Sequence, residues 1–77
     1  MPKAFVLINV ESGSEEEVLE QVKKVEGVNE AYYSYGVYDI IAKITSETME
    51  KLRETVTQKV RTILKVRSTL TLIMMEE

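Results

Sequence analysis

Apolar residues cluster in four segments of the chain in the way that strands require, and two further segments repeat them at helical spacing. Segments rich in β-branched, aromatic and aliphatic side chains are typical of strands, and the chain has four of them: residues 3–10, 28–35, 37–44 and 66–75. Apolar residues also recur every three or four positions from Val18 to Val25 and from Met49 to Leu64, which predicts two helices. The predicted order is therefore strand, helix, strand, strand, helix, strand.

Turn and capping residues mark the expected ends of these elements. Ser14 precedes the first predicted helix and has a glutamate three residues later, which is the spacing of a capping box. Gly27 is expected to stop that helix, and Gly36 is expected to form the turn between the second and third strands. Thr45 or Ser46 is expected to cap the second helix.

This element order predicts an α+β fold, a ferredoxin-like βαββαβ sandwich with an antiparallel sheet in the order 4-1-3-2. Both helices then cover the same face of the sheet, and the opposite face should be polar. It is not polar, because the first strand alone carries Phe5 and Leu7 opposite Val6 and Ile8. A second apolar face left in water would be an oversized hydrophobic patch. We therefore expect the sheets of two subunits to pack face to face, or their strands to pair edge to edge.

Composition narrows the chemistry that is open to the chain. Its 77 residues make one domain, and scaffolds of this size usually need a disulfide, a metal or a partner subunit. There is no Cys, which excludes disulfides and thiolate metal sites, and no His, which removes the commonest general base and transition-metal ligand. We therefore expect association with other copies to supply the additional stabilisation, with no metal and no cofactor. No apolar run is long enough for a signal peptide or a membrane span, which favours a cytoplasmic protein without membrane contact.

The second half of the chain holds a run of basic residues that invites a nucleic-acid interpretation. These residues are Lys51, Arg53, Lys59, Arg61, Lys65 and Arg67. Electrostatic binding to phosphates favours a net basic domain, whereas the net charge here is −3. The preferred interpretation is the solvated face of a helix, with no direct contact to nucleic acid.

Asp39 is the most informative polar residue, because it leads into an apolar run three residues after Gly36. A carboxylate buried there needs a partner, which a backbone amide of the hairpin, a neighbouring side chain or the ammonium group of a ligand would each provide. In the 4-1-3-2 order, the third and fourth strands start at the same edge of the sheet, roughly 9–10 Å apart across the first strand. Asp39 would therefore face Thr69 and Thr71 across a gap that suits a zwitterion. Packing alone also accounts for the threonines, since Thr is a good strand former.

Two segments of the chain resemble one family. Residues 36–43, Gly-Val-Tyr-Asp-Ile-Ile-Ala-Lys, resemble the glycine-x-x-aspartate hairpin of the effector domain of Lrp/AsnC regulators, often called RAM. Residues 66–76 resemble the last strand of that domain, including its threonine-x-threonine, and the match runs over essentially the whole chain. One departure is Lys65, which stands where the family usually has a glycine before the valine of that strand.

The resemblance implies a domain that dimerises through its sheet as a dimeric α+β barrel and often assembles into rings. It also implies that small effectors, usually amino acids, bind at contacts between dimers. The residues that would line the effector site are Gly36, Val37, Tyr38, Asp39, Thr69 and Thr71. Full-length members begin with a helix-turn-helix domain, and nothing precedes Met1 here. The expectation is a single stand-alone domain over residues 1–77 that takes part in regulating amino-acid metabolism without contacting DNA, either alone or together with full-length regulators.

Two other functions share this architecture. Cofactor-free dimeric α+β barrel enzymes, such as monooxygenases and isomerases, need a polar cavity that often holds a His, and Asp39 would be the one candidate base here. RNA-recognition motifs expect a basic-glycine-aromatic-glycine-aromatic run on the third strand. Residues 36–40 supply one aromatic side chain and an acid that would repel phosphate. We therefore expect a binding and assembly module with no catalytic residue.

Overall fold

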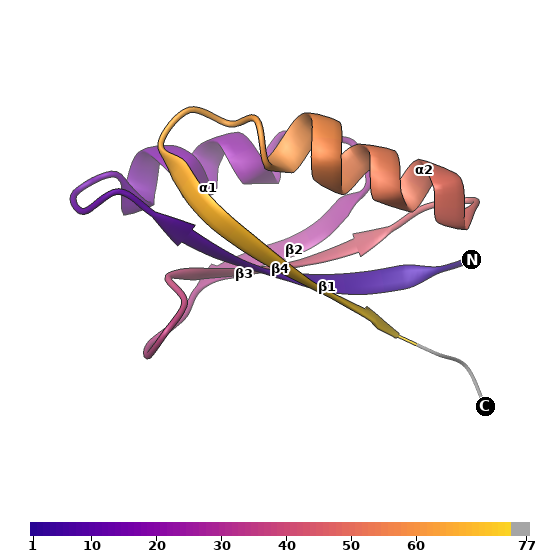
Figure 1. Ribbon diagram of the computed structural model, residues 1–77, viewed down its shortest axis with the longest axis horizontal. Helices are drawn as coiled ribbons and strands as arrows, with labels where there is room; N and C mark the ends of the chain where they lie inside the picture. The colour runs from indigo at the N-terminus through magenta and orange to yellow at the C-terminus, as the bar shows by residue number, and fades with distance from the viewer. Residues whose placement is uncertain (75–77) are drawn as a thin grey trace.

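The computed structural model describes residues 1–74, which form a four-stranded antiparallel sheet with its helices on one face (Figure 1). The strands are β1 (Lys3–Val10), β2 (Val28–Tyr33), β3 (Ile40–Thr45) and β4 (Val66–Met74). The α-helix α1 (Glu15–Lys23) joins β1 to β2, and α2 (Met49–Glu54) continues into a π-helical segment, η1 (Thr55–Val60), before β4. The sheet order β2-β3-β1-β4 confirms the predicted ferredoxin-like topology. Met75, which the sequence assigns to the last strand, lies outside the described residues.

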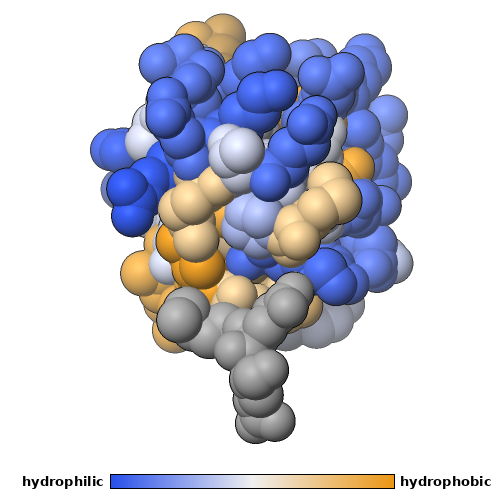
Figure 2. Space-filling view, turned by 90° about the vertical axis from the view of Figure 1, so that its right-hand side faces the viewer, coloured by the Kyte–Doolittle hydropathy of each residue, from blue (hydrophilic) through white to orange (hydrophobic). Residues whose placement is uncertain are grey.

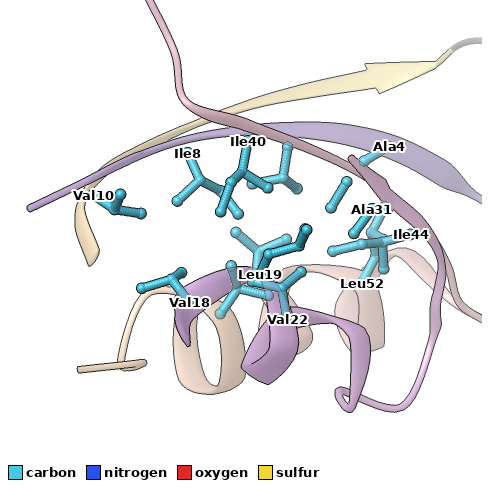
Figure 3. Close-up of a cluster of buried hydrophobic side chains, with 14 residues drawn as sticks. Ala4, Ile8, Val10, Val18, Leu19, Val22, Ala31, Ile40, Ile44 and Leu52 are labelled. Atoms are coloured by element: carbon cyan, nitrogen blue, oxygen red, sulfur yellow. The ribbon is translucent and has the colours of Figure 1, made fainter. Parts of the chain in front are cut away.

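The core lies between the sheet and the helices (Figure 3). Because side chains alternate along a strand, β1 sends every second residue toward the helices, and all four of these residues are buried: Ala4, Val6, Ile8 and Val10. The helix α1 meets them with Val18, Leu19 and Val22, whose spacing puts them on one helical face. Burying one such side chain stabilises the fold by about 1.5–3 kcal/mol.

The helix α1 begins where the sequence predicts, but the capping box does not form. Ser14 is the N-cap residue, and its hydroxyl makes no capping hydrogen bond. Its backbone has φ −105° and ψ 9°, away from the extended conformation that aims an N-cap side chain at the helix amides. Its carbonyl instead accepts from the Val18 amide at 3.0 Å, which starts the helix through the main chain alone.

The predicted cap of the second helix is wrong. Thr45 is the last residue of β3, and its amide donates to the Gly27 carbonyl at 2.9 Å, so it remains in the sheet. Thr48 caps α2 instead, because its hydroxyl accepts from the Lys51 amide at 3.1 Å. Gly27 has φ 100°, and a Cβ added there would lie 3.2 Å from the Thr45 carbonyl oxygen. This close approach to β3 explains the glycine that follows α1.

The second helix changes character after Glu54. In η1, the Arg61 amide donates to the Val56 carbonyl at 2.9 Å, five residues back, which is the π-helical pattern. The predicted apolar stripe is right for Leu52, Val56 and Val60, all of which are buried. It is wrong for Leu64, which follows the end of η1 and is 76% exposed.

The face of the sheet turned away from the helices is also largely apolar. Its central side chains come from all four strands and stand in two adjacent rows, Tyr32, Ile41, Leu7 and Leu70, and then Glu30, Lys43, Phe5 and Leu72. We call these eight residues the open face. Hydrophobic surface gathers on the sheet side of the molecule, whereas the helix side is mostly hydrophilic (Figure 2). The helices thus cover one apolar face and leave the other without a cover from residues 1–74.

Candidate functional site

The loop between β2 and β3 is longer than the predicted hairpin turn. The strands end at Tyr33 and resume at Ile40, and Tyr35 and Val37 between them are exposed. The Ser34 amide donates to the Asp39 carbonyl at 2.8 Å and closes the loop, and Gly36 sits inside it with φ 111°. The loop projects away from the helices (Figure 1), and Val37 at its tip is 82% exposed.

Asp39 ends the hydrogen-bond ladder between β1 and β3. Its amide donates to the Ile8 carbonyl at 2.9 Å, and its Oδ2 accepts from the Val10 amide at 2.9 Å. The carboxylate thereby supplies the acceptor that β3 would have offered had it begun earlier. The backbone amide that satisfies Asp39 is therefore in β1 and not in the hairpin itself.

A β-bulge interrupts β4 beside Asp39. Asn9 pairs with Ser68 and Val10 pairs with Val66, so Arg67 is an extra residue with no partner in β1. Bulges of this kind redirect side chains near strand ends. The Asn9 amide group also lies 3.5 Å from the Ser68 hydroxyl, at the limit of a hydrogen bond.

A depression of about 550 Å³ opens at this end of the sheet. Its lining residues are Asn9, Val10, Ser12, Glu15, Asp39, Arg67 and Ser68. Three of them carry charge: Glu15, Asp39 and Arg67. The ion pairs formed among residues 1–74 are Lys43 with Glu30, Lys51 with Glu47 and Lys65 with Glu17, so none of these three groups is in an ion pair there.

The threonines predicted to face Asp39 are only partly brought to it. Thr69 pairs with Ile8, whose carbonyl accepts from the Asp39 amide, so Thr69 and Asp39 flank the same residue of β1 as the topology predicts. Thr71 pairs with Val6 further along the strand. It lines a separate groove of about 230 Å³ between β4 and the second helix, with Leu52, Arg53, Val56, Thr57 and Ile73. The predicted site residues therefore do not share one cavity within a single chain.

Of the seven lining residues, only Asp39 belongs to the predicted site, and the two other charged ones are Glu15 and Arg67. Arg67 was attributed to a solvated helix face, because it continues a series of basic residues. Its position beside Asp39 depends on the β-bulge in β4, for which the sequence has no recognisable signal. A carboxylate at the start of α1 looks like an ordinary helix-dipole residue, and only the topology brings Glu15 to the same depression.

Tyr32, on the open face, has a hydroxyl with a raised pKa. Its hydroxyl donates to Glu30 at 2.9 Å, and this hydrogen bond together with the negative charge of Glu30 raises the pKa of Tyr32. Lys43 lies 4.0 Å from the same carboxylate. The three side chains form a polar cluster at the β2 side of an otherwise apolar surface.

Residues 1–74 hold no group of three or more Asp, Glu, His or Cys side chains placed to bind a metal ion. No helix in that range combines the length and apolar character needed to span a membrane.

Known protein families, sequences and structures include relatives of this chain. The family model of the Lrp/AsnC ligand binding domain matches residues 3–77. An uncharacterized HTH-type transcriptional regulator of Pyrococcus furiosus is 36% identical over 73 residues, which are 91% of this chain and 49% of that relative. The crystal structure of FFRP-DM1 superimposes with a TM-score of 0.93 at 36% identity, over 97% of this chain and 100% of its own. E. coli AsnC gives a TM-score of 0.91 at 28% identity, over 99% of this chain and 52% of its own. The chain spans about half the length of the curated regulators that it matches.

Proposed function

The chain belongs to the Lrp/AsnC ligand-binding domain family, and on that premise we propose that it binds a small amino acid and assembles with other copies of itself. Its relatives are transcriptional regulators, so we propose a part in transcription regulation of amino-acid metabolism, in the cytoplasm, without catalysis and without direct contact to DNA. The observation that carries the proposal is the carboxylate of Asp39 beside a polar depression. Its bond to the Val10 amide occupies one carboxylate oxygen and leaves the other for an ammonium group.

The proposed effector site contains Gly36, Val37, Tyr38, Asp39, Thr69 and Thr71. Asp39 would accept from the ammonium group of the ligand, which makes the strong, charge-assisted kind of hydrogen bond. Thr71 opens into a groove of its own, so a site that uses both residues needs a second copy. The loop tip supports this arrangement, because Val37 projects into solvent where a neighbouring copy could meet it.

The open face is the proposed surface for the first partner, a second copy of this chain. It has an apolar centre, with Leu70 43% and Leu72 49% exposed, and a polar margin in the Tyr32 cluster. An apolar centre with a polar rim is the usual anatomy of a protein interface. Rings of such dimers and mixed assemblies with full-length regulators extend the same proposal.

A thermal-shift screen against the twenty amino acids tests effector binding. A ligand present at about 100 times its Kd stabilises the folded state by about 2.7 kcal/mol. Asp39→Asn is the sharp variant, because the side-chain oxygen of Asn still accepts from the Val10 amide while the negative charge is lost. We expect Asp39→Asn to abolish the shift and to leave the unliganded protein close to its original stability.

Two results would contradict the proposal. If none of the twenty amino acids gives a shift, the chain does not bind an amino-acid effector. If a shift survives in Asp39→Asn, the carboxylate serves only the Val10 amide. Glu16→Asn is the matched control, because Glu16 carries the same charge but does not line the depression.

A further inference from the structure

The depression beside Asp39 gathers two carboxylates and one guanidinium. Glu15 begins α1, Asp39 ends the β2–β3 loop, and Arg67 lies at the bulge of β4, so three separate segments bring their charges to one cavity. None of the three forms an ion pair with another charged residue in the described part of the chain. The lining therefore has two negative groups and one positive group that remain available to a ligand.

The bulge explains how Arg67 comes to line this cavity. Successive residues of a regular strand point to opposite faces of the sheet. Arg67 and Ser68 are successive residues, yet both line the same depression. The extra residue in β4 breaks the alternation at this point, since Asn9 pairs with Ser68 and the next pair joins Val10 to Val66. Without the bulge, one of these two side chains would point to the other face.

We propose that this depression selects a basic α-amino acid, a ligand with one carboxylate and two cationic groups. Arg67 binds the α-carboxylate, because a planar guanidinium matches a carboxylate with two parallel hydrogen bonds. Asp39 accepts from the α-ammonium group, and Glu15 accepts from the cationic end of the side chain. The ligand charges of two positive and one negative then complement the lining charges of two negative and one positive.

A neutral amino acid would leave one lining carboxylate without a partner, and an acidic one would add a second negative group to a net negative cavity. The volume of about 550 Å³ lies within the range of small-molecule sites, roughly 300–1,000 Å³, and leaves room for an extended side chain. The inference rests on the proposed function, because it names the ligand class of the site that contains Asp39.

Isothermal titration with three related compounds tests the assignment. The first is L-lysine, the second is L-norleucine, which lacks the terminal ammonium, and the third is cadaverine, which lacks the carboxylate. We expect L-lysine to bind about tenfold or more tightly than either analogue, because each analogue loses one charged contact. Equal binding of L-lysine and L-norleucine, or no binding of L-lysine, would overturn the proposal.

Two variants test which residue contacts each end of the ligand. Arg67→Gln should weaken L-lysine about tenfold but should not weaken cadaverine, because cadaverine has no carboxylate for Arg67 to bind. Glu15→Gln should weaken L-lysine and leave L-norleucine unchanged. Arg61→Gln and Glu16→Gln are the matched controls, since neither residue lines the depression, and both should bind L-lysine like the original chain. An Arg67→Gln variant that keeps full affinity for L-lysine would refute the proposed contact between Arg67 and the α-carboxylate.

The amino-acid site and its preference for a basic ligand can be contradicted separately. If L-norleucine or another neutral amino acid binds, L-lysine does not, and Asp39→Asn abolishes that binding, the charge assignment is wrong and the amino-acid site stands. If none of the twenty amino acids binds, both proposals fall.

Discussion

The two faces of the sheet are built from the same strands but end in different environments. On the helix side, β1 presents only aliphatic side chains, and each of the four is buried by helices of the same chain. On the open face, the same strand presents Phe5 and Leu7, which the helices do not reach. One face is therefore closed within the chain, whereas the other is suited to closure by a partner. The apolar character of a strand face does not by itself say which of the two occurs.

The largest expected effect belongs to the closed face. Ile8 is fully buried between the sheet and the helices, so Ile8→Ala leaves a cavity that the surrounding backbone fills only in part. We expect the free energy of unfolding to fall by about 2–5 kcal/mol, measured by chemical denaturation. A loss below about 1 kcal/mol would mean that this face is not the packed core.

The next effect belongs to the open face. Leu70→Lys places a charge in the centre of the proposed interface, and we expect the dimer to weaken by about 30-fold or more. Size-exclusion chromatography with light scattering across a concentration series measures the change. Leu64→Lys is the matched control, since Leu64 is 76% exposed and lies outside the open face. If the unsubstituted protein is a monomer at all concentrations, the proposed dimer is contradicted.

A smaller effect is expected at Lys65, which precedes β4 and belongs to neither face. Lys65 has φ 78°, in the left-handed region that costs a non-glycine residue roughly 1–2 kcal/mol. Lys65→Gly relieves that strain and loses an exposed ion pair with Glu17 at 3.4 Å, which contributes at most about 1 kcal/mol. We expect a net gain of a few tenths to about 1 kcal/mol with no change in assembly.

Lys65→Gln separates the two contributions at that position. It keeps the left-handed backbone and removes the ion pair, so thermal unfolding should show no gain in stability. An equal gain in both variants would mean that the ion pair, and not the backbone, is unfavourable.

The smallest effect concerns the polar margin of the open face. Because the pKa of Tyr32 is raised by its hydrogen bond to Glu30, the hydroxyl keeps its proton to higher pH than in the unfolded chain. The stabilisation from this bond is complete below the ordinary pKa of about 10 and is lost as the pH rises through the folded-state value. Ultraviolet titration should show a late-ionising tyrosine that disappears in Tyr32→Phe. A late step that persists in the variant would assign it to another tyrosine.

The sequence predicted the order of elements, the sheet topology and both apolar faces, because a period of two along a strand is a local property. It placed the edges of the hairpin wrongly, because Tyr35 and Val37 are typical strand residues but lie exposed in the loop. It also missed the cap at Thr48, because several Ser and Thr residues precede the second helix. The predicted helix pattern also does not distinguish the π-helical geometry of η1 from an α-helix.

Among the residues that line the depression, the sequence singled out Asp39 and none of the other six. Asp39 stood out because a charge beside an apolar run is a local anomaly. Its partner, the Val10 amide, lies 29 positions away in the chain and emerges only when β1 and β3 pair. Arg67 reaches the depression through a register shift between β1 and β4, which depends on the fit of two distant strands.

The carboxylate of Asp39 also has a consequence for communication within the molecule. The same carboxylate accepts from the Val10 amide of β1 through one oxygen and lines the cavity, so a ligand that bound its other oxygen would be two bonds away from the main chain of β1. The same strand carries Phe5 and Leu7 on the surface proposed for subunit contact. If a ligand altered this bond and thereby subunit association, reciprocity would require association to alter ligand affinity by the same factor.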